Sequence, residues 1–241
     1  MSLSAFVSFS YLALVLGILA YGFTALGKGE HKPGTPAFSR AVDAYTERVA
    51  RTIAYLIVLT ILVSAANAVS RYALNMASNA WLELQWSLYA AAFLFGASWA
   101  LKGGDHVRID IISSNLPIKA RNWIDVFGHV VFLIPFCVIH LWYGFDYASR
   151  SIQSGETSTH AGGLIYWPAK LILMLGFVLL LLQGFSELVK RVAIIRGIMP
   201  QDGTNELTPA EREALEAVEA LKSSGAVVAH GAPSVTAPAK S

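Results

Sequence analysis

Five long apolar runs constrain this chain more than any other feature. A helix that crosses a bilayer needs about 20 mostly apolar residues, and five stretches reach or approach that length: 3–26, 53–70, 84–101, 123–144 and 168–188. Only 14% of the residues are charged, against about 25% in soluble domains. The sequence therefore predicts an all-α fold: a polytopic membrane helix bundle with about five transmembrane helices and additional interfacial amphipathic helices.

Lysine and arginine residues alternate between the segments that separate these runs. They gather in segments 27–52 and 102–122 and at the start of the tail, whereas the two intervening segments contain one arginine each, Arg71 and Arg150. Loops rich in lysine and arginine stay in the cytoplasm. The pattern therefore predicts that the basic segments and the tail are cytoplasmic and that the N-terminus lies on the other side.

The runs divide the chain into four predicted parts. Residues 1–27 form an extra transmembrane helix, because this stretch lacks the basic start and the cleavage site of a signal peptide. Residues 28–52 form a cytoplasmic loop with an interfacial helix at 35–52, and residues 53–192 form a four-helix membrane domain. Residues 193–241 form a cytoplasmic tail, first a short helix and then disorder.

Two amphipathic segments are predicted to lie at the membrane surface. In 35–52 the apolar side chains recur at helical spacing on one face: Phe38, Val42, Tyr45 and Val49. Such a helix can lie in the membrane surface or pack on another protein. Segment 105–118 is predicted to be a short interfacial helix, because an isolated strand would leave unpaired edges beside the bilayer.

The sequence lacks the residues that catalysis or transport would need. The middles of the five runs contain no Asp, Glu, Lys or Arg, whereas transporters place their sites near the midplane. The single cysteine excludes a Cys-rich metal site, and no nucleophile motif is present. A haem on His129 or His140 would need a histidine at matching depth on another helix. A net charge of +2 gives no support for a nucleic-acid partner. We therefore expect no enzyme and no catalytic, substrate-binding or metal-binding residue.

Polar residues gather instead at the ends of the runs. Arg71 and Asn75 end the second run, and Trp81 and Glu83 begin the third. The short linker allows Arg71 to approach Glu83, although both are equally well interpreted as ordinary boundary residues. The third run is followed by a dense polar segment, in which Lys102 and Arg108 suffice for topology. We expect its other polar residues to order the turn and to contact a partner: Asp105, His106 and Asp110.

Several of these residues form motifs that resemble the DctQ-type small membrane subunit of tripartite ATP-independent periplasmic (TRAP) transporters. Arg71-Tyr72 with Asn75 resembles the family's Arg-Tyr…Asn segment, and Trp81-Leu82-Glu83 resembles its Trp-x-Glu-Glu segment, with Leu84 in place of the second Glu. Two longer stretches also match in order and spacing: Gly96, Leu101, Gly104, His106, Asp110, Leu116 and Pro117, then Trp167, Pro168, Lys170, Gly176, Leu182, Gln183, Gly184 and Glu187. The resemblance covers about residues 50–192.

The resemblance implies a role in a larger assembly. In such systems a periplasmic substrate-binding protein captures an organic acid, and a large membrane subunit carries it inward with sodium. The small subunit packs against the large one and stabilises its static part. The resemblance thus implies a multi-pass protein of the bacterial inner membrane, for which the distribution of lysine and arginine predicts a periplasmic N-terminus and a cytoplasmic C-terminus. It implies no cofactor in this chain, since sodium coupling belongs to the large subunit.

The polar residues at the ends of the runs and the resemblance together give a set of structural or subunit-interface candidates: Arg71, Asn75, Trp81, Glu83, Asp105, His106, Asp110, Trp167, Lys170, Gln183 and Glu187. Two other functions remain open at this stage. The chain could be the membrane-anchor subunit of a respiratory or other membrane enzyme complex, or a self-contained channel or carrier, which the uncharged middles of the runs disfavour.

Overall fold

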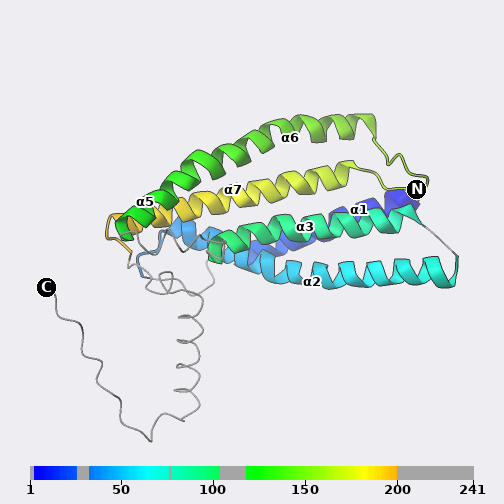
Figure 1. Cartoon of the computed structure of the whole chain (residues 1–241), viewed down its shortest axis with the longest axis horizontal. Helices are drawn as coiled ribbons and strands as arrows, with labels where there is room; N and C mark the ends of the chain where they lie inside the picture. Colours follow the sequence, from blue (N-terminus) through cyan, green and yellow to red (C-terminus); the bar gives the residue numbers. More distant parts are fainter. Residues whose placement is uncertain (1–2, 26–32, 76–77, 104–117, 200–241) are drawn as a thin grey trace, which may run out of the picture.

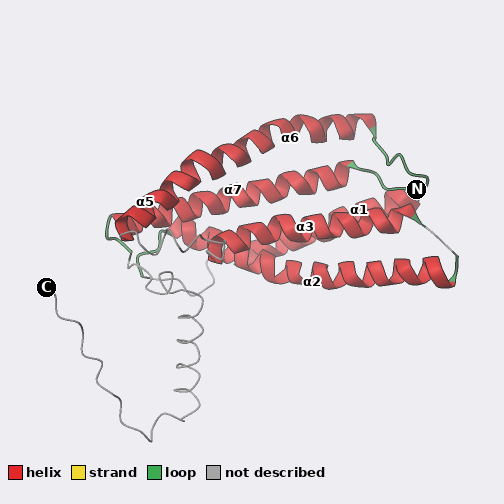
Figure 2. Cartoon of the chain, in the orientation of Figure 1, coloured by secondary structure: helices red, strands yellow, loops and turns green. Residues whose placement is uncertain are grey.

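The computed structural model describes residues 3–25, 33–75, 78–103 and 118–199, and its long elements are helices (Figure 2). In chain order they are α1 (Leu3–Gly22), the 3₁₀ turn η1 (Phe23–Ala25), α2 (Ala37–Ala73), α3 (Asn79–Gly103), α5 (Ile118–Gly128), the π-helical turn η2 (His129–Leu133), α6 (Ile134–Ser154) and α7 (Trp167–Ile195). The predicted helix at 105–118, except for its last residue, and the tail from residue 200 lie outside the described residues.

The helices run alongside one another between two ends of an elongated bundle (Figure 1). We call the end that carries the α6–α7 connection, residues 155–166, the loop end. The opposite end, where Lys102 and Lys190 lie, is the tail end. Helices α1, α3 and α7 run from the loop end to the tail end, and α2 and α5–α6 run the other way. Helix α7 lies between α3 and α6 and packs on both.

Four of the helical segments are long and apolar enough to cross a membrane: Ser4–Gly22, Ala37–Ala73, Lys119–Ser154 and Trp167–Ile195. Helix α3 is not among these four, and Gln85 and Trp86 lie in its loop-end half. With 25 residues it is nevertheless about 38 Å long, and it lies between α2 and α7. The predicted all-α membrane bundle is therefore confirmed.

The structure corrects the division between the helix at 35–52 and the second span. Helix α2 continues without a break from Ala37 to Ala73. No proline or glycine occurs within it, so nothing in the backbone ends the helix before the span begins. Its first part does not present one apolar face to lipid, because Ser39, Asp43 and Thr46 are buried together with Val49.

The fourth span is also longer than predicted. Helix α5, the π-helical turn and α6 form one curved segment, which is the outermost part of the bundle beside α7 (Figure 1). The bend coincides with the π-helical turn and with Pro135, the second residue of α6. Both features interrupt the regular backbone hydrogen bonds of a helix and are common causes of kinks.

The apolar core lies where α1, α2, α3 and α7 meet, and each contributes fully buried side chains, among them Val15, Val49, Phe95 and Ile172. Gly176 allows α7 to approach α3 closely. A Cβ atom at Gly176 would lie only 2.8 Å from the Cβ atom of Leu94, so any larger residue there would push the two helices apart.

Helix α1 is part of this core and not an appendage. Its Tyr11 hydroxyl donates a 2.6 Å hydrogen bond to the Ser87 carbonyl oxygen in α3. The Ser8 hydroxyl oxygen accepts a 3.1 Å hydrogen bond from the Ile165 N–H group in the α6–α7 connection. These bonds fix α1 to two elements that lie far from it in the sequence.

Candidate functional site: two polar clusters joined by α7

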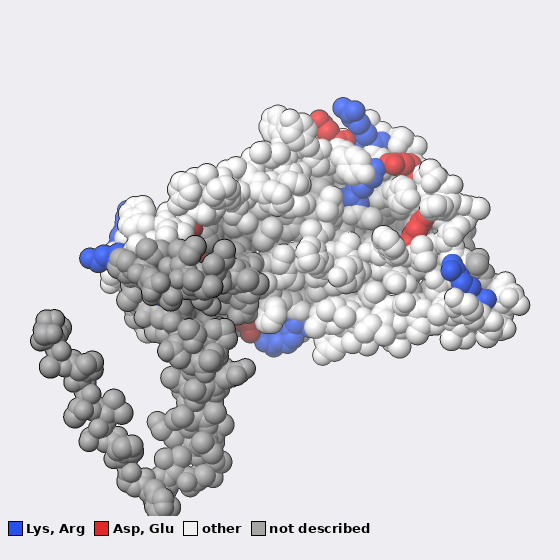
Figure 3. All heavy atoms as spheres, viewed as in Figure 1, with Lys and Arg blue, Asp and Glu red and all other residues white. Residues whose placement is uncertain are grey.

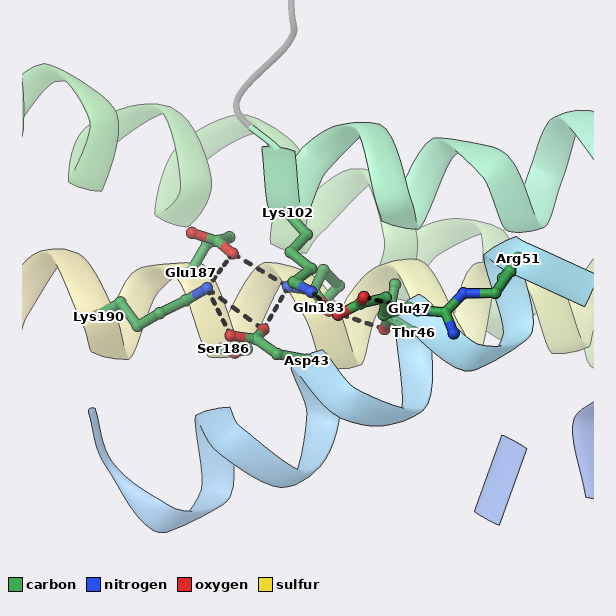
Figure 4. Close-up of polar contacts among 9 residues, drawn as sticks. All are labelled: Asp43, Thr46, Glu47, Arg51, Lys102, Gln183, Ser186, Glu187 and Lys190. Carbon is green, nitrogen blue, oxygen red and sulfur yellow. Dashed lines mark hydrogen bonds and ion pairs between the residues drawn. The ribbon is translucent and has the colours of Figure 1, made fainter. Parts of the chain in front are cut away.

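A buried polar cluster joins α2 to α7 at the tail end (Figure 4). We call it the tail-end cluster, and it consists of Asp43, Thr46, Gln183, Ser186, Glu187 and Lys190. Lys190 Nζ lies 3.0 Å from Asp43 Oδ2 and also forms an ion pair with Glu187. The cluster therefore holds two carboxylates against one ammonium group.

Gln183 lies in the middle of the tail-end cluster and is completely buried. Its Nε2 donates hydrogen bonds to Asp43 Oδ1 at 2.9 Å and to Glu187 Oε1 at 3.0 Å. Its Oε1 accepts a 2.8 Å hydrogen bond from the Thr46 hydroxyl. The amide therefore satisfies both carboxylates at once, and a buried polar network with all its partners in place is one that a membrane bundle tolerates.

Helix periodicity explains why these residues meet. Gln183, Ser186, Glu187 and Lys190 follow one another at intervals of three, one and three residues, so they form one stripe along α7. Asp43 and Thr46 lie three residues apart on the stripe of α2 that faces it. The Ser186 hydroxyl donates to Asp43 Oδ1 at 3.2 Å, which adds another link between the helices.

Weaker polar contacts tie further helices together at the tail end. Glu47 binds Lys102 of α3 at 2.9 Å and Arg51 of its own helix at 3.0 Å. Arg191 of α7 lies 3.3 Å from Asp125 of α5. Helix α7 is thus bound to α2 and α5 at this end, and α2 is bound to α3.

A second polar cluster lies at the loop end of α7. Lys170 is nearly buried, with 9% of the residue exposed. Its ammonium group forms an ion pair with Glu156 and lies 3.7 Å from the centre of the Tyr147 ring. The Ser151 hydroxyl donates a 2.8 Å hydrogen bond to the same Glu156 oxygen, Oε2. The Lys170 ammonium, and after it the Ser151 hydroxyl, lower the pKa of the Glu156 carboxyl, because both stabilise the charged form.

Glu83 organises the neighbouring α6–α7 connection. One of its carboxylate oxygens accepts a hydrogen bond from the Ser158 hydroxyl, and the other accepts one from the Leu164 N–H group at 2.6 Å. Asn79 donates to the Ala161 carbonyl oxygen at 3.0 Å. The first turn of α3 therefore supports the loop that enters α7.

The predicted approach of Arg71 to Glu83 is wrong. In the described part of the chain the two residues form no ion pair, and Arg71 is exposed at the end of α2.

Asn75 follows helix α2 with a left-handed backbone, φ 54°. Trp81 is 45% exposed on α3, and Trp167 begins α7 with its ring 5.5 Å from that of Phe9. These residues lie at the loop end but do not form one site.

Three of the other candidates lie in the two polar clusters. Lys170 belongs to the loop-end cluster, and Gln183 and Glu187 belong to the tail-end cluster. Asp105, His106 and Asp110 lie outside the described residues. The predicted role of these side chains in subunit contacts stays a prediction.

Sequence reasoning missed Asp43, Lys190 and Glu156. Asp43 lies in the segment predicted to be a surface helix, yet it is only 7% exposed. The stripe of α7 residues from Gln183 to Lys190 was a usable signal, because four polar side chains on one face of an apolar helix need a polar partner. Glu156 lies in a loop, and no local pattern connects it with Lys170.

Both clusters consist of hydrogen bonds and ion pairs that join elements of the bundle. Among the residues that the structure describes, no group of three His, Cys, Asp or Glu side chains could hold a metal ion. Charged side chains gather toward the two ends of the bundle and leave a mostly uncharged band between them on the face in Figure 3. The Nδ1 atoms of His129 and His140 lie 2.7 Å and 2.8 Å from carbonyl oxygens of their own helical segment.

The fold and the two clusters define a multi-pass helical membrane protein whose charged contacts hold its helices together. A family comparison places it within that class. The family model of the DctQ component of tripartite ATP-independent periplasmic transporters matches residues 60–193. The chain therefore belongs to the DctQ component family of TRAP transporters, a family of the bacterial inner membrane. No curated protein matches the sequence.

Proposed function

We propose that this chain is the non-catalytic small subunit that scaffolds the large membrane subunit of a sodium-coupled TRAP transporter. The large subunit would carry an organic acid that a periplasmic binding protein delivers. The family match over residues 60–193 carries this proposal. The predicted absence of a cofactor is part of it, since sodium coupling would reside on the large subunit.

The distribution of polar groups supports a static role. The described polar networks lie near the ends of α7, and the core between them is apolar. A transport site would need polar or charged groups near the midplane. Helix α7 is bound to α2 and α5 at one end and to the α6–α7 connection at the other, so the bundle suits a part that stays still while a partner moves.

The orientation is part of the proposal. Basic residues at the tail end include Arg40, Arg48, Arg51, Lys102, Lys119, Arg121, Lys190, Arg191 and Arg196, whereas those at the loop end include Arg71, Arg150 and Lys170. This imbalance favours a cytoplasmic tail end. The loop end would then face the periplasm, where the binding protein docks.

Reconstitution tests the scaffold role. Proteoliposomes with the large subunit, with or without this chain, receive the substrate-loaded binding protein and an inward sodium gradient. We expect uptake only when both membrane subunits are present, and none in liposomes that contain this chain alone. Equal uptake by the large subunit without this chain would refute the scaffold role, and uptake by this chain alone would make it a carrier.

A further inference from the structure

A furrow lies between α3 and α6 at the loop end, and α7 forms its floor. Figure 1 shows α3 and α6 on opposite sides of α7. The furrow has a volume of about 440 Å³. Its walls come from Trp86, Ala90 and Leu94 on α3 and from Tyr147 on α6, and its floor includes Ile172 and Leu173 on α7.

The furrow is polar at its mouth and apolar inside. Lys170 and Glu156 line the mouth together with Tyr166, whereas the parts nearer the middle of the bundle are apolar. A second cavity of about 400 Å³ shares the lining residues Tyr147 and Leu173 with the furrow and is also lined by Ile139, His140 and Phe177. The two neighbouring cavities therefore form a mostly apolar path from the ion pair toward the middle of the bundle.

The two charges at the mouth are adjacent and opposite, and each retains bonding capacity. An ammonium group has three N–H donors, and Lys170 directs them at Glu156 and at the face of Tyr147, which leaves one. Glu156 uses only Oε2 in its contacts with described residues, and its side chain is 41% exposed. The mouth can thus accept an anionic and a cationic group side by side.

We propose that the furrow binds one phospholipid whose headgroup carries both a phosphate and a primary ammonium group. The phosphate would meet Lys170, the ammonium would meet Glu156, and an acyl chain would fill the apolar path. A headgroup with only negative charge would bring its charge close to the Glu156 carboxylate. Because Lys170 lies in the first turn of α7, the mouth is at the depth of lipid headgroups and the path is at the depth of acyl chains.

Native mass spectrometry of the full-length chain tests this site. The chain is purified in detergent, incubated with equimolar phosphatidylethanolamine and phosphatidylglycerol, and scored for the lipid that stays bound. We expect one phosphatidylethanolamine to be retained in preference to phosphatidylglycerol by about tenfold, which corresponds to about 1.4 kcal/mol. Equal retention of the two lipids would overturn the proposal.

Three variants separate binding at this site from general lipid adhesion. Ala90→Trp fills the furrow without touching the ion pair and should abolish retention, whereas Ala65→Trp, at an exposed position on α2 outside the furrow, should retain the lipid. Glu156→Gln should remove the preference between the two lipids. Undiminished retention by Ala90→Trp, or an unchanged preference in Glu156→Gln, would overturn the proposal.

The same Ala90→Trp variant distinguishes a lipid from a protein occupant. If it keeps its phosphatidylethanolamine but no longer copurifies with the large subunit, the furrow is a subunit interface and the lipid site is refuted. Because the lipid measurement uses this chain alone, its outcome is independent of whether the scaffold role holds.

Discussion

Lys170 and Lys190 lie on the same helix and bind carboxylates at its opposite ends, Lys170 binding Glu156 and Lys190 binding Asp43. Twenty residues of α-helix rise about 30 Å, which equals the thickness of the hydrocarbon core of a bilayer. The two ion pairs are therefore spaced to lie at the two boundaries of that core. The charged contacts of α7 are thus placed where a charge costs less free energy than in the hydrocarbon core. The middle of the helix is held by apolar packing.

Replacing Gln183 by leucine should destabilise the bundle by about 2 kcal/mol, because it removes hydrogen bonds to Thr46 and Asp43 and leaves a buried carboxylate less satisfied. Thermal unfolding in detergent would measure the loss. Gln85→Leu on α3 is the matched control, since Gln85 makes no side-chain hydrogen bond with the described residues. A similar change in both variants would contradict the importance of the tail-end cluster.

Lys190→Met should cost about 3 kcal/mol, because Asp43 and Glu187 would then lose their shared counter-charge in a nearly buried site. Lys102→Met removes the exposed pair with Glu47 and should cost about 0–1 kcal/mol. The double variant Asp43→Asn/Lys190→Met should recover part of the loss. If the stability lost in the double variant equals the sum of the losses in the two single variants, the two residues are not coupled.

Acidification should loosen the loop end through Glu156. Its pKa is lowered below the usual value of 4.5, first by Lys170 and then by Ser151. The folded-state pKa is therefore below the unfolded one, so this contribution is present above about pH 4.5 and is lost as the pH falls through the folded value. Unfolding temperatures between pH 7 and pH 3 should show this loss, and Glu156→Gln should remove that part of the pH dependence. An unchanged profile in Glu156→Gln would assign the effect to another group.

Glu83→Gln should loosen the α6–α7 connection, because an amide has only one acceptor oxygen for the Ser158 hydroxyl and the Leu164 N–H group. Hydrogen exchange at the Leu164 amide should become about tenfold faster, which corresponds to about 1.4 kcal/mol. Asp146→Asn, which alters another acid at the loop end, should leave that amide unchanged. Equal exchange rates of the Leu164 amide in the wild type and in Glu83→Gln would show that the α6–α7 connection is stabilised by its own internal contacts.

The two tight glycines of α7 should respond differently to alanine. A Cβ at Gly176 would lie 2.8 Å from Leu94 Cβ, whereas one at Gly184 would lie 2.8 Å from Leu133 Cδ2, the tip of a flexible side chain. Gly176→Ala should therefore cost about 1–3 kcal/mol and Gly184→Ala less. Gly17→Ala, with nothing within 4 Å, is the control in the same unfolding assay. A reversed order would mean that the α3–α7 contact adjusts freely.

The sequence predicted the helices well but not how they meet. Length and apolar composition suffice to predict a membrane helix, because the bilayer forces backbone groups to bond within the segment. Hydropathy could not show that the helix predicted at 35–52 continues into the second span as one helix, α2, since a helix continues into an apolar stretch when no proline or glycine stops it. Nor could a local pattern place Asp43 beside Gln183, because those partners are 140 residues apart.

The position of α5 and α6 has a consequence for how the protein comes apart. In the part of the chain that the structure describes, this long outer segment packs chiefly on α7, whereas α1, α2, α3 and α7 share one core. Detaching the outer segment exposes one side of α7 and leaves that core closed. We therefore expect gradual denaturation to release the outer segment before the rest.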